Sequence, residues 1–252
     1  MNKGWLLVSF LMVWPYFIKS QTFWDQHGAI IQSDNSLPNI YLCFTGHDYA
    51  DGFELVLSVL DSFAIKASFF LTGDFIRNQP KLTQSIIDQK HYLGIHSDQH
   101  LLYNDWEDRN ILLIAPELIK EDIENNLAEL AEFGVFHAPI WMPPYEWYNK
   151  QVTEIALELG LTAVNFSPGT RSNADYTTPK MKNYLSSEDI YQSIISFEEK
   201  EGMNGFHLLI HPGVSPDRVD KFYYRLSELI EYLKSKGYRF QSFRDYLIPK
   251  ND

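Results

Sequence analysis

Two histidines four residues apart, His96 and His100, are the first residues of this chain whose spacing suggests chemistry. They stand in the stretch LGIHSDQHLLY, directly after a short apolar run. Imidazoles at this spacing lie on one face of a helical turn or on one side of a tight loop, so both can reach the same metal ion. The alternative interpretation is one histidine that packs or caps beside another that is solvated.

The elements that must position this pair alternate along the chain. Short β-rich runs are expected at residues 39–44, 66–71, 91–95, 138–142, 161–166, 205–210 and 238–243. Helices, with apolar residues three or four apart, are expected at residues 53–65, 80–90, 116–134, 150–160, 187–202 and 220–237. Seven such units predict an α/β fold with a parallel barrel or sheet.

Polar stretches follow several of these strands, and such loops hold the working residues of parallel α/β folds. They are TGHDYADG (45–52), HSDQH (96–100), PPYEWYN (143–149), SPGTRSNADY (167–176) and HPG (211–213). Because they follow the carboxyl ends of strands, we expect them to converge on one rim. This convergence favours the metal-site interpretation of His96 and His100.

Composition limits the classes of partner. The 252 residues carry a formal net charge of -12, which argues against nucleic acid and anionic membranes because both would be repelled. Six Trp, 15 Tyr and 17 Phe suit the flat faces of sugar rings, although most aromatic residues of any protein serve its core and rim.

The first 20 residues have the layout of a secretory signal peptide, with Lys3 before an apolar run from Gly4 to Ile18. Pro15 interrupts a run that is too short to span a membrane comfortably, so we expect cleavage near Ser20 rather than a retained anchor, and no stable membrane insertion afterwards. A lead-in at 21–38 and a catalytic domain at 39–252 complete the expected organisation. The only cysteine, Cys43, excludes an intramolecular disulfide, and an exported protein of the bacterial periplasm or exterior is expected.

These motifs resemble those of the polysaccharide deacetylase family, the NodB-homology members of carbohydrate esterase family 4. HSDQH matches the His-Ser/Thr-x-x-His metal motif, and KASFFLTGDFI is similar to the second-strand segment that follows the first motif. PPYEW resembles the third motif, and LLIH, which ends at His211, resembles the last. The resemblance covers residues 39 to the end and implies a distorted, incomplete (β/α)7 barrel.

The resemblance also implies a mechanism. A divalent metal held by an aspartate, His96 and His100 activates a water that attacks an acetyl carbonyl, an aspartate acts as base, and His211 protonates the leaving group. With nitrogen ligands and one oxygen ligand, zinc, cobalt and nickel all fit, and the sequence does not choose among them. His211 as a cap at a strand end is the alternative role.

Two departures from the family pattern mark a divergent member. Where the family has Thr-Phe-Asp-Asp-Gly, this chain reads CFTGHDYADG, so the adjacent acid pair is absent. The arginine of the third motif is replaced by Met142. We assign Asp48 as the metal carboxylate and Asp51 as the base, with an N-cap as the alternative for Asp51. His47 is a further candidate ligand.

Other residues receive supporting roles. Asp175, with Tyr176, resembles the fourth motif and is expected to orient His211, unless it is a solvated loop acid. Tyr145 and Trp147 are expected to stack on sugar, with rim packing as their alternative. Asp98 is expected to form a local turn rather than to bind metal.

The leading function is a secreted metal-dependent hydrolase that removes N- or O-linked acetyl groups from a polysaccharide or oligosaccharide. A carbohydrate-binding protein on the same barrel, with no competent base, is the rival from a different class. A hydrolase of another small amide, such as a formamide, is the third hypothesis.

Overall fold

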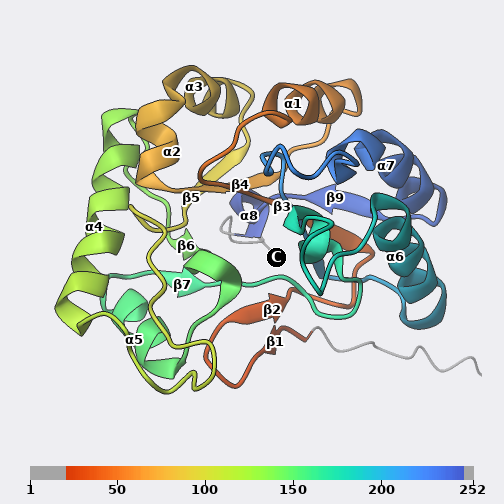
Figure 1. Ribbon diagram of the computed structural model, residues 1–252. Coiled ribbons are helices and arrows are strands. Elements are labelled where there is room, and N and C mark those ends of the chain that lie inside the picture. Colours follow the sequence, from red (N-terminus) through yellow and green to blue (C-terminus); the bar gives the residue numbers. More distant parts are fainter. Residues whose placement is uncertain (1–20, 247–252) are drawn as a thin grey trace, which may run out of the picture.

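A curled, mostly parallel sheet with helices around its outside forms the body of the protein (Figure 1). The structure is a computed structural model that describes residues 21–246, so the expected signal peptide lies outside the described residues. The strands are β1 (Phe23–Trp24), β2 (Ile30–Gln32), β3 (Asn39–Gly46), β4 (Ser68–Leu71), β5 (Tyr92–Ile95), β6 (Ile140–Trp141), β7 (Thr162–Ala163), β8 (Phe206–Ile210) and β9 (Arg239–Gln241). Each of the seven expected β-runs coincides with one of the strands from β3 to β9, and β3 continues past its expected run to Gly46.

Most helices cover the outer face of this sheet, and the short last one lies inside the ring, where Phe243 packs with Tyr41 and Phe70 (Figure 1). The helices are α1 (Phe53–Ser62), α2 (Gly73–Asn78), α3 (Pro80–Asp88), α4 (Pro116–Glu132), α5 (Lys150–Glu158), α6 (Ser187–Glu201), α7 (Leu226–Ser235) and α8 (Phe243–Tyr246), with 3-10 turns η1 (Pro144–Glu146), η2 (Ser172–Tyr176) and η3 (Phe222–Arg225). Helix α1 shows why they form. Its buried residues Phe53, Val56, Leu57 and Leu60 recur every three or four positions, so one stripe faces the core.

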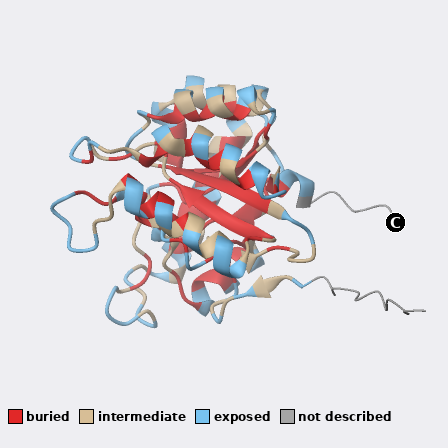
Figure 2. Ribbon diagram, turned by 90° about the vertical axis from the view of Figure 1, so that its right-hand side faces the viewer, coloured by how far each residue is buried: buried red, intermediate tan, exposed pale blue. Residues whose placement is uncertain are grey.

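The strand order is β1-β2-β8-β3-β4-β5-β6-β7, with β9 beside the first half of β3. Strand β3 lies at the centre and is buried along nearly its whole length, as expected of a parallel strand covered on both faces (Figure 2). Its register places Thr45 opposite Phe70 and Gly46 opposite Leu71 of β4. The expected incomplete barrel is thereby confirmed.

The lead-in at 21–38 is not only a connector, because it contains β1 and β2. Strand β2 pairs antiparallel with β8 through Gln32 and Phe206, and Ile30 forms a parallel bridge with Val164 just beyond β7. The sequence offered little signal for these short strands. They narrow the gap that the incomplete barrel leaves between β7 and β8.

The loops after β3, β5, β6 and β8 meet at the carboxyl ends of the strands, as the parallel arrangement requires. One close approach joins the first loop to the last. A Cβ at Gly213 would lie 1.7 Å from the carbonyl oxygen of Tyr49, so only glycine allows this approach. Among residues 21–246, none of the helices is long and apolar enough to cross a membrane.

Candidate active site

His96 and His100 lie on a tight loop after β5, which is one of the two expected arrangements. Their Nε2 atoms are 3.2 Å apart. Two nitrogens that each lie about 2.1 Å from one zinc ion, at a tetrahedral angle, are separated by roughly 3.4 Å. The spacing of the pair therefore fits two ligands of one ion.

Asn126 of helix α4 holds the backbone of this loop in place. The Oδ1 atom of Asn126 accepts the backbone N–H groups of His96 at 2.9 Å and Ser97 at 3.0 Å. The Nδ1–H of His96 donates to the carbonyl oxygen of Met142 at 2.8 Å. This bond leaves the lone pair on Nε2, which is the tautomer that binds a metal through that atom.

Burial keeps both imidazoles neutral. It lowers the pKa of His96 to about 3, against the opposing hydrogen bond to Met142. It also lowers the pKa of His100, and the neighbouring His96 adds to the effect. Neutral imidazole is the form that ligates metal, so the pair is ready to bind an ion at neutral pH.

His211 lies after β8 and pairs with Asp175 from η2. Its Nδ1–H donates to Oδ1 of Asp175 at 2.5 Å, and its backbone N–H donates to Oδ2 at 2.8 Å. Burial alone would lower the pKa of His211, but the charge and hydrogen bond of Asp175 outweigh it and raise the pKa above its usual value. Asp175 thus favours the protonated form of His211.

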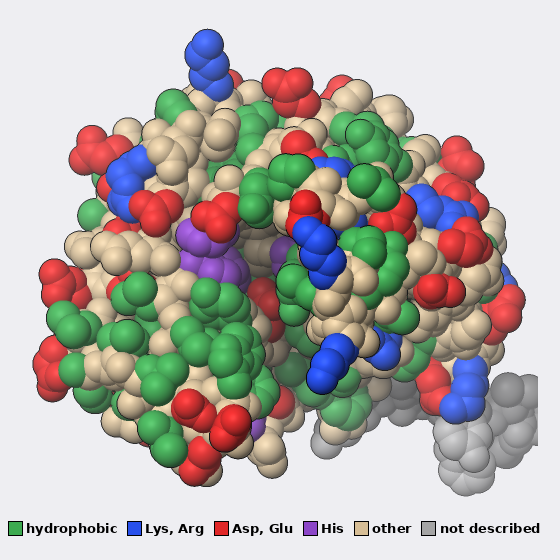
Figure 3. Space-filling model, in the orientation of Figure 1, with side chains coloured by type: hydrophobic (Ala, Val, Ile, Leu, Met, Phe, Trp, Pro, Cys, Tyr) green, Lys and Arg blue, Asp and Glu red, His purple; other side chains and the backbone are tan. Residues whose placement is uncertain are grey.

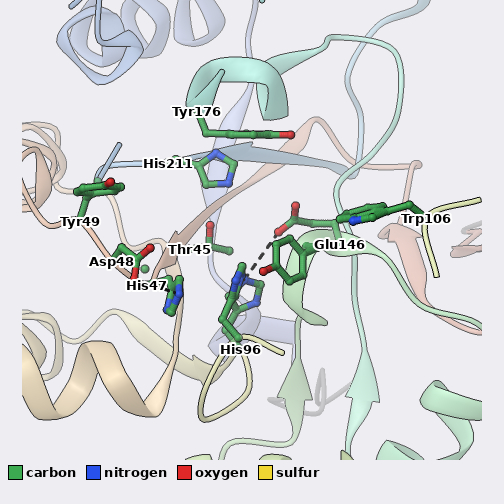
Figure 4. Close-up of a pocket in the computed structure, with 13 residues that line it drawn as sticks. Thr45, His47, Asp48, Tyr49, His96, Trp106, Glu146, Tyr176 and His211 are labelled. Carbon is green, nitrogen blue, oxygen red and sulfur yellow. Dashed lines mark hydrogen bonds and ion pairs between the residues drawn. The ribbon is translucent and has the colours of Figure 1, made fainter. Parts of the chain in front are cut away.

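These groups share one pocket of about 380 Å³. Its lining includes Thr45, His47, Asp48, Tyr49, His96, His100, Trp106, Tyr145, Glu146, Tyr176 and His211. The space-filling view shows histidine side chains at a hollow on this face, with hydrophobic side chains beside it (Figure 3). The close-up places His96 and His211 on different sides of the same space (Figure 4).

The family model described as polysaccharide deacetylase matches residues 33–164. The chain belongs to the polysaccharide deacetylase family. It is 24% identical over 228 residues to the peptidoglycan-N-acetylmuramic acid deacetylase PdaA of Bacillus subtilis, covering 90% of this chain and 78% of that protein. It is also 24% identical over 185 residues to a chitooligosaccharide deacetylase of Rhizobium leguminosarum, covering 73% of this chain and 72% of that protein.

Solved structures show the same fold. The structure of B. subtilis PdaA, a family 4 carbohydrate esterase, superposes with a TM-score of 0.68 at 23% identity, covering 87% of this chain and 84% of that one. A carbohydrate esterase family 4 pseudoenzyme from Bacillus anthracis superposes with a TM-score of 0.71 at 16% identity, covering 88% and 69%. A mutant of that pseudoenzyme with restored activity gives a TM-score of 0.70.

In the loop after β3, Asp51 does not lie where the expected role as base would require it. Its carboxylate accepts bonds from the backbone N–H of Val214 at 3.1 Å, Nζ of Lys221 at 2.5 Å and the hydroxyl of Tyr223 at 2.5 Å. Asp51 does not line the pocket, and it is not an N-cap either, because Gly52 holds that position without a side-chain cap. The structure therefore does not bring Asp51, the expected base, into the pocket, and its carboxylate joins the first loop to the loop after β8.

Asp48 and His47 do line the pocket, but they face each other. Oδ1 of Asp48 lies 3.1 Å from Nε2 of His47, and the Asp48 side chain is 67% exposed. The His47 ring stacks on His100 with centroids 4.4 Å apart. Within residues 21–246 no three His, Cys, Asp or Glu side chains form a ready metal cluster, so the His96–His100 pair fits an ion while the third ligand is not preformed.

The third-motif loop brings Tyr145 to the pocket and leaves Trp147 outside it. Tyr145 packs on His100 with ring centroids 4.2 Å apart. Trp147 instead donates from Nε1 to the carbonyl oxygen of Asp105 and lies under the guanidinium of Arg109, 3.5 Å from the ring centroid. The structure therefore does not bring Trp147 to the expected sugar surface, and Trp106, which the sequence analysis did not select, lines the pocket there.

Asp98 lies outside the pocket, and its side chain contacts a neighbouring helix. It is 5% exposed, and its Oδ1 atom accepts from Arg77 of α2 at 2.7 Å. Asp98 therefore ties the metal-motif loop to α2.

Glu146 is a second pocket residue that sequence reasoning missed. It lines the pocket, and burial raises the pKa of its carboxyl to about 7, against the opposing field of His211. The signal that could have found it is an acid directly after Pro-Pro-Tyr, in a rim loop of a chain whose first loop has lost its acid pair.

Proposed function

We propose that this protein is a metal-dependent hydrolase that removes acetyl groups, N- or O-linked, from a polysaccharide or oligosaccharide. One observation carries the proposal: the His211–Asp175 pair and the His96–His100 pair open into one pocket. A proton donor opposite a two-histidine ion site is the arrangement that amide or ester hydrolysis needs. Its relatives named as deacetylases of peptidoglycan and chitooligosaccharide support this substrate class.

Different residues of the pocket have different roles in the proposed reaction. His96 and His100 would hold zinc, cobalt or nickel, which would polarise the acetyl carbonyl and acidify the attacking water. His211 donates a proton from Nε2 to the departing nitrogen or oxygen, because its Nδ1–H is already given to Asp175. The aromatic rings of Trp106, Tyr145 and Tyr176 at the pocket provide flat surfaces for sugar rings.

Export to the periplasm or exterior of a bacterium is part of the proposal, on the strength of the apolar run Gly4–Ile18. Fractionation of the producing cell and N-terminal sequencing of the mature protein test it. A mature protein that starts near residue 21 outside the cytoplasm is the expected result.

The decisive experiment is acetate release from a panel of acetylated glycans. Metal-stripped protein is compared with protein reloaded with zinc, cobalt or nickel. We expect release from at least one glycan only after reloading. Glycan binding without acetate release under every loading would contradict the proposal.

That contrary result would favour the rival, a carbohydrate-binding protein on the same fold. The rival has one observation in its favour, since the acid pair of the family's first motif is absent here. His211→Ala separates the two hypotheses. A hydrolase should lose roughly 10²–10⁴-fold in turnover, with its metal intact, whereas glycan binding should hardly change.

A further inference from the structure

Glu146 is the more buried of the two acids that line this pocket in the described part of the chain. Of the acidic side chains in residues 21–246, Asp48 and Glu146 line it, and their exposures differ. The Asp48 side chain is 67% exposed, whereas that of Glu146 is 11% exposed. Oε1 of Glu146 lies 3.9 Å from Nε2 of His96. The close-up shows its carboxylate in the space between His96 and His211 (Figure 4).

The backbone of the third-motif loop is bent to turn this side chain inward. Tyr145 and Glu146 both have left-handed conformations, with φ of 60° and 52°. Such conformations cost non-glycine residues on the order of 1 kcal/mol each and persist where the surroundings hold them. Here the Glu146 N–H donates to Pro143 at 3.1 Å, and Asn165 donates to the Glu146 carbonyl at 3.2 Å. Two adjacent strained residues at a pocket wall point to a functional constraint.

The carboxylate of Glu146 is also free to accept a proton. Within the described residues no hydrogen bond to it is formed, and its approach to His96 is too long for one. Asp51, the acid expected in this role, is by contrast occupied by Val214, Lys221 and Tyr223. A carboxylate that is only 11% exposed and accepts no hydrogen bond is costly to hold, so its presence at this pocket calls for a function.

We infer that Glu146 is the catalytic carboxylate that accepts a proton from the attacking water, in place of the aspartate missing from the first loop. The inference rests on the proposed function. It moves the base from the loop after β3 to the loop after β6.

The step balances as an ordinary hydrolysis. As the water oxygen bonds to the acetyl carbon, the carbonyl π pair moves to oxygen and one water proton passes to Glu146. When the C=O bond re-forms, the C–N or C–O bond breaks, and its electron pair takes a proton from Nε2 of His211. The products are acetic acid, which ionises in solvent, and the free amine or alcohol. Proton transfer from Glu146 to His211 through solvent then restores both residues.

The test compares Glu146→Gln with the parent and with Glu154→Gln, an exposed glutamate of α5 that serves as matched control. We expect Glu146→Gln to keep its metal and its affinity for the deacetylated glycan while kcat falls roughly 10²–10⁴-fold. The metal-free Glu146→Gln protein should melt no lower than the parent, because a neutral amide replaces a largely buried acid that accepts no hydrogen bond. Glu154→Gln should match the parent in every measurement.

Two results would overturn the inference. Loss of metal from Glu146→Gln would make Glu146 a ligand, and turnover within about twofold of the parent would make it a spectator. An aryl acetate, whose leaving group needs no protonation, separates these results from failure of the proposed function. Activity on this ester that depends on Glu146, without activity on any glycan, would retain the inference and reject the polysaccharide substrate. No hydrolysis of either substrate by the metal-loaded parent would reject both.

Discussion

Asp175 holds His211 by two contacts, one from each carboxylate oxygen. Oδ1 accepts from the imidazole Nδ1 at 2.5 Å, and Oδ2 accepts the backbone N–H at 2.8 Å. The Asp175 residue is 1% exposed, so water screens the pair little. The double contact fixes both the ring and the strand end that carries it, and it leaves Nε2 for the pocket.

We predict that Asp175→Asn moves the alkaline limb of the pH–rate profile to lower pH. Asp175 raises the pKa of His211 by stabilising the imidazolium, so its removal lowers that pKa. The protonated donor is then lost at a lower pH as the pH rises. The measurement is kcat/KM against pH on an acetylated glycan, with metal content determined at each point.

The same variant should lose up to roughly 10²-fold in turnover at its optimum, because the asparagine no longer favours the charged ring. Metal content should stay at the parent level, since Asp175 binds His211 and does not line the pocket. An unchanged alkaline limb would show that His211 is not the group titrating there.

The barrel could be predicted because its signals are local. Each central strand is a short apolar run, and the helices repeat buried residues at helical spacing, as α7 does with Leu226, Leu229, Ile230 and Leu233. The two-residue β1 and three-residue β2 carry no such signal, and they depend on β8 for their pairing. Helix α2, begun by the Thr72 cap, was missed because it is only six residues long.

The site could be predicted only in part. The histidines follow strand ends, so parallel topology alone brings His96, His100 and His211 to one rim. The acids could not be placed this way, because their directions depend on backbone conformation and on distant partners. The Asp51 side chain contacts Lys221, which lies 170 positions away along the chain. The Glu146 side chain points into the pocket because Tyr145 and Glu146 have left-handed backbone conformations, which the sequence does not predict.

We predict that the double variant His96→Ala/His100→Ala loses bound metal and keeps its fold. In the proposed site the pair provides two of the ligand atoms, whereas the core of this domain extends far beyond them. Elemental analysis and circular dichroism are the measurements, with the exposed His137→Ala as matched control. One equivalent of metal in the folded double variant would place the ion elsewhere.

The third ligand is predicted to come from the His47–Asp48 pair, because Asp48 is exposed enough to rotate toward an ion held by His96 and His100. Asp48→Asn should weaken metal binding by roughly tenfold or more, since a neutral oxygen attracts a divalent cation less than a carboxylate does. Metal titration of Asp48→Asn and of His47→Ala is the measurement. A loss confined to His47→Ala would show that the imidazole is the third ligand.

Asp51→Asn is predicted to lower stability rather than chemistry. The Lys221 and Tyr223 hydrogen bonds, against the cost of burial, lower the pKa of Asp51, so the ionised carboxylate stabilises the fold at neutral pH. With its side chain 37% exposed, we expect a loss of about 1–2 kcal/mol in the free energy of unfolding.

The difference in the free energy of unfolding between Asp51→Asn and the parent should shrink at acidic pH. A lowered folded-state pKa gives stability that is present above the ordinary aspartate range and is lost as the pH falls through the folded value. Urea unfolding at neutral and acidic pH measures it, with the exposed Asp61→Asn as control. A gap that widens in acid would contradict the assigned interactions.

Trp106 is predicted to bind the sugar. Its side chain lines the pocket, is 54% exposed, and meets Tyr145 edge to face with ring centroids 5.5 Å apart. Trp147 also packs on Trp106, with ring centroids 5.5 Å apart. A ring held this way presents a firm flat face for a sugar at little entropic cost.

Trp106→Ala should therefore raise KM by roughly 2- to 10-fold and leave kcat nearly unchanged, the pattern of lost uniform binding. Trp24→Ala is the matched control, because Trp24 is 56% exposed on β1 and does not line this pocket. Steady-state kinetics on a glycan and on a small aryl acetate provide the measurement, and the small ester, which has no sugar to stack, should show no change. If kcat falls on both substrates instead, Trp106 acts by holding Tyr145 against His100, and the sugar surface lies elsewhere on the rim.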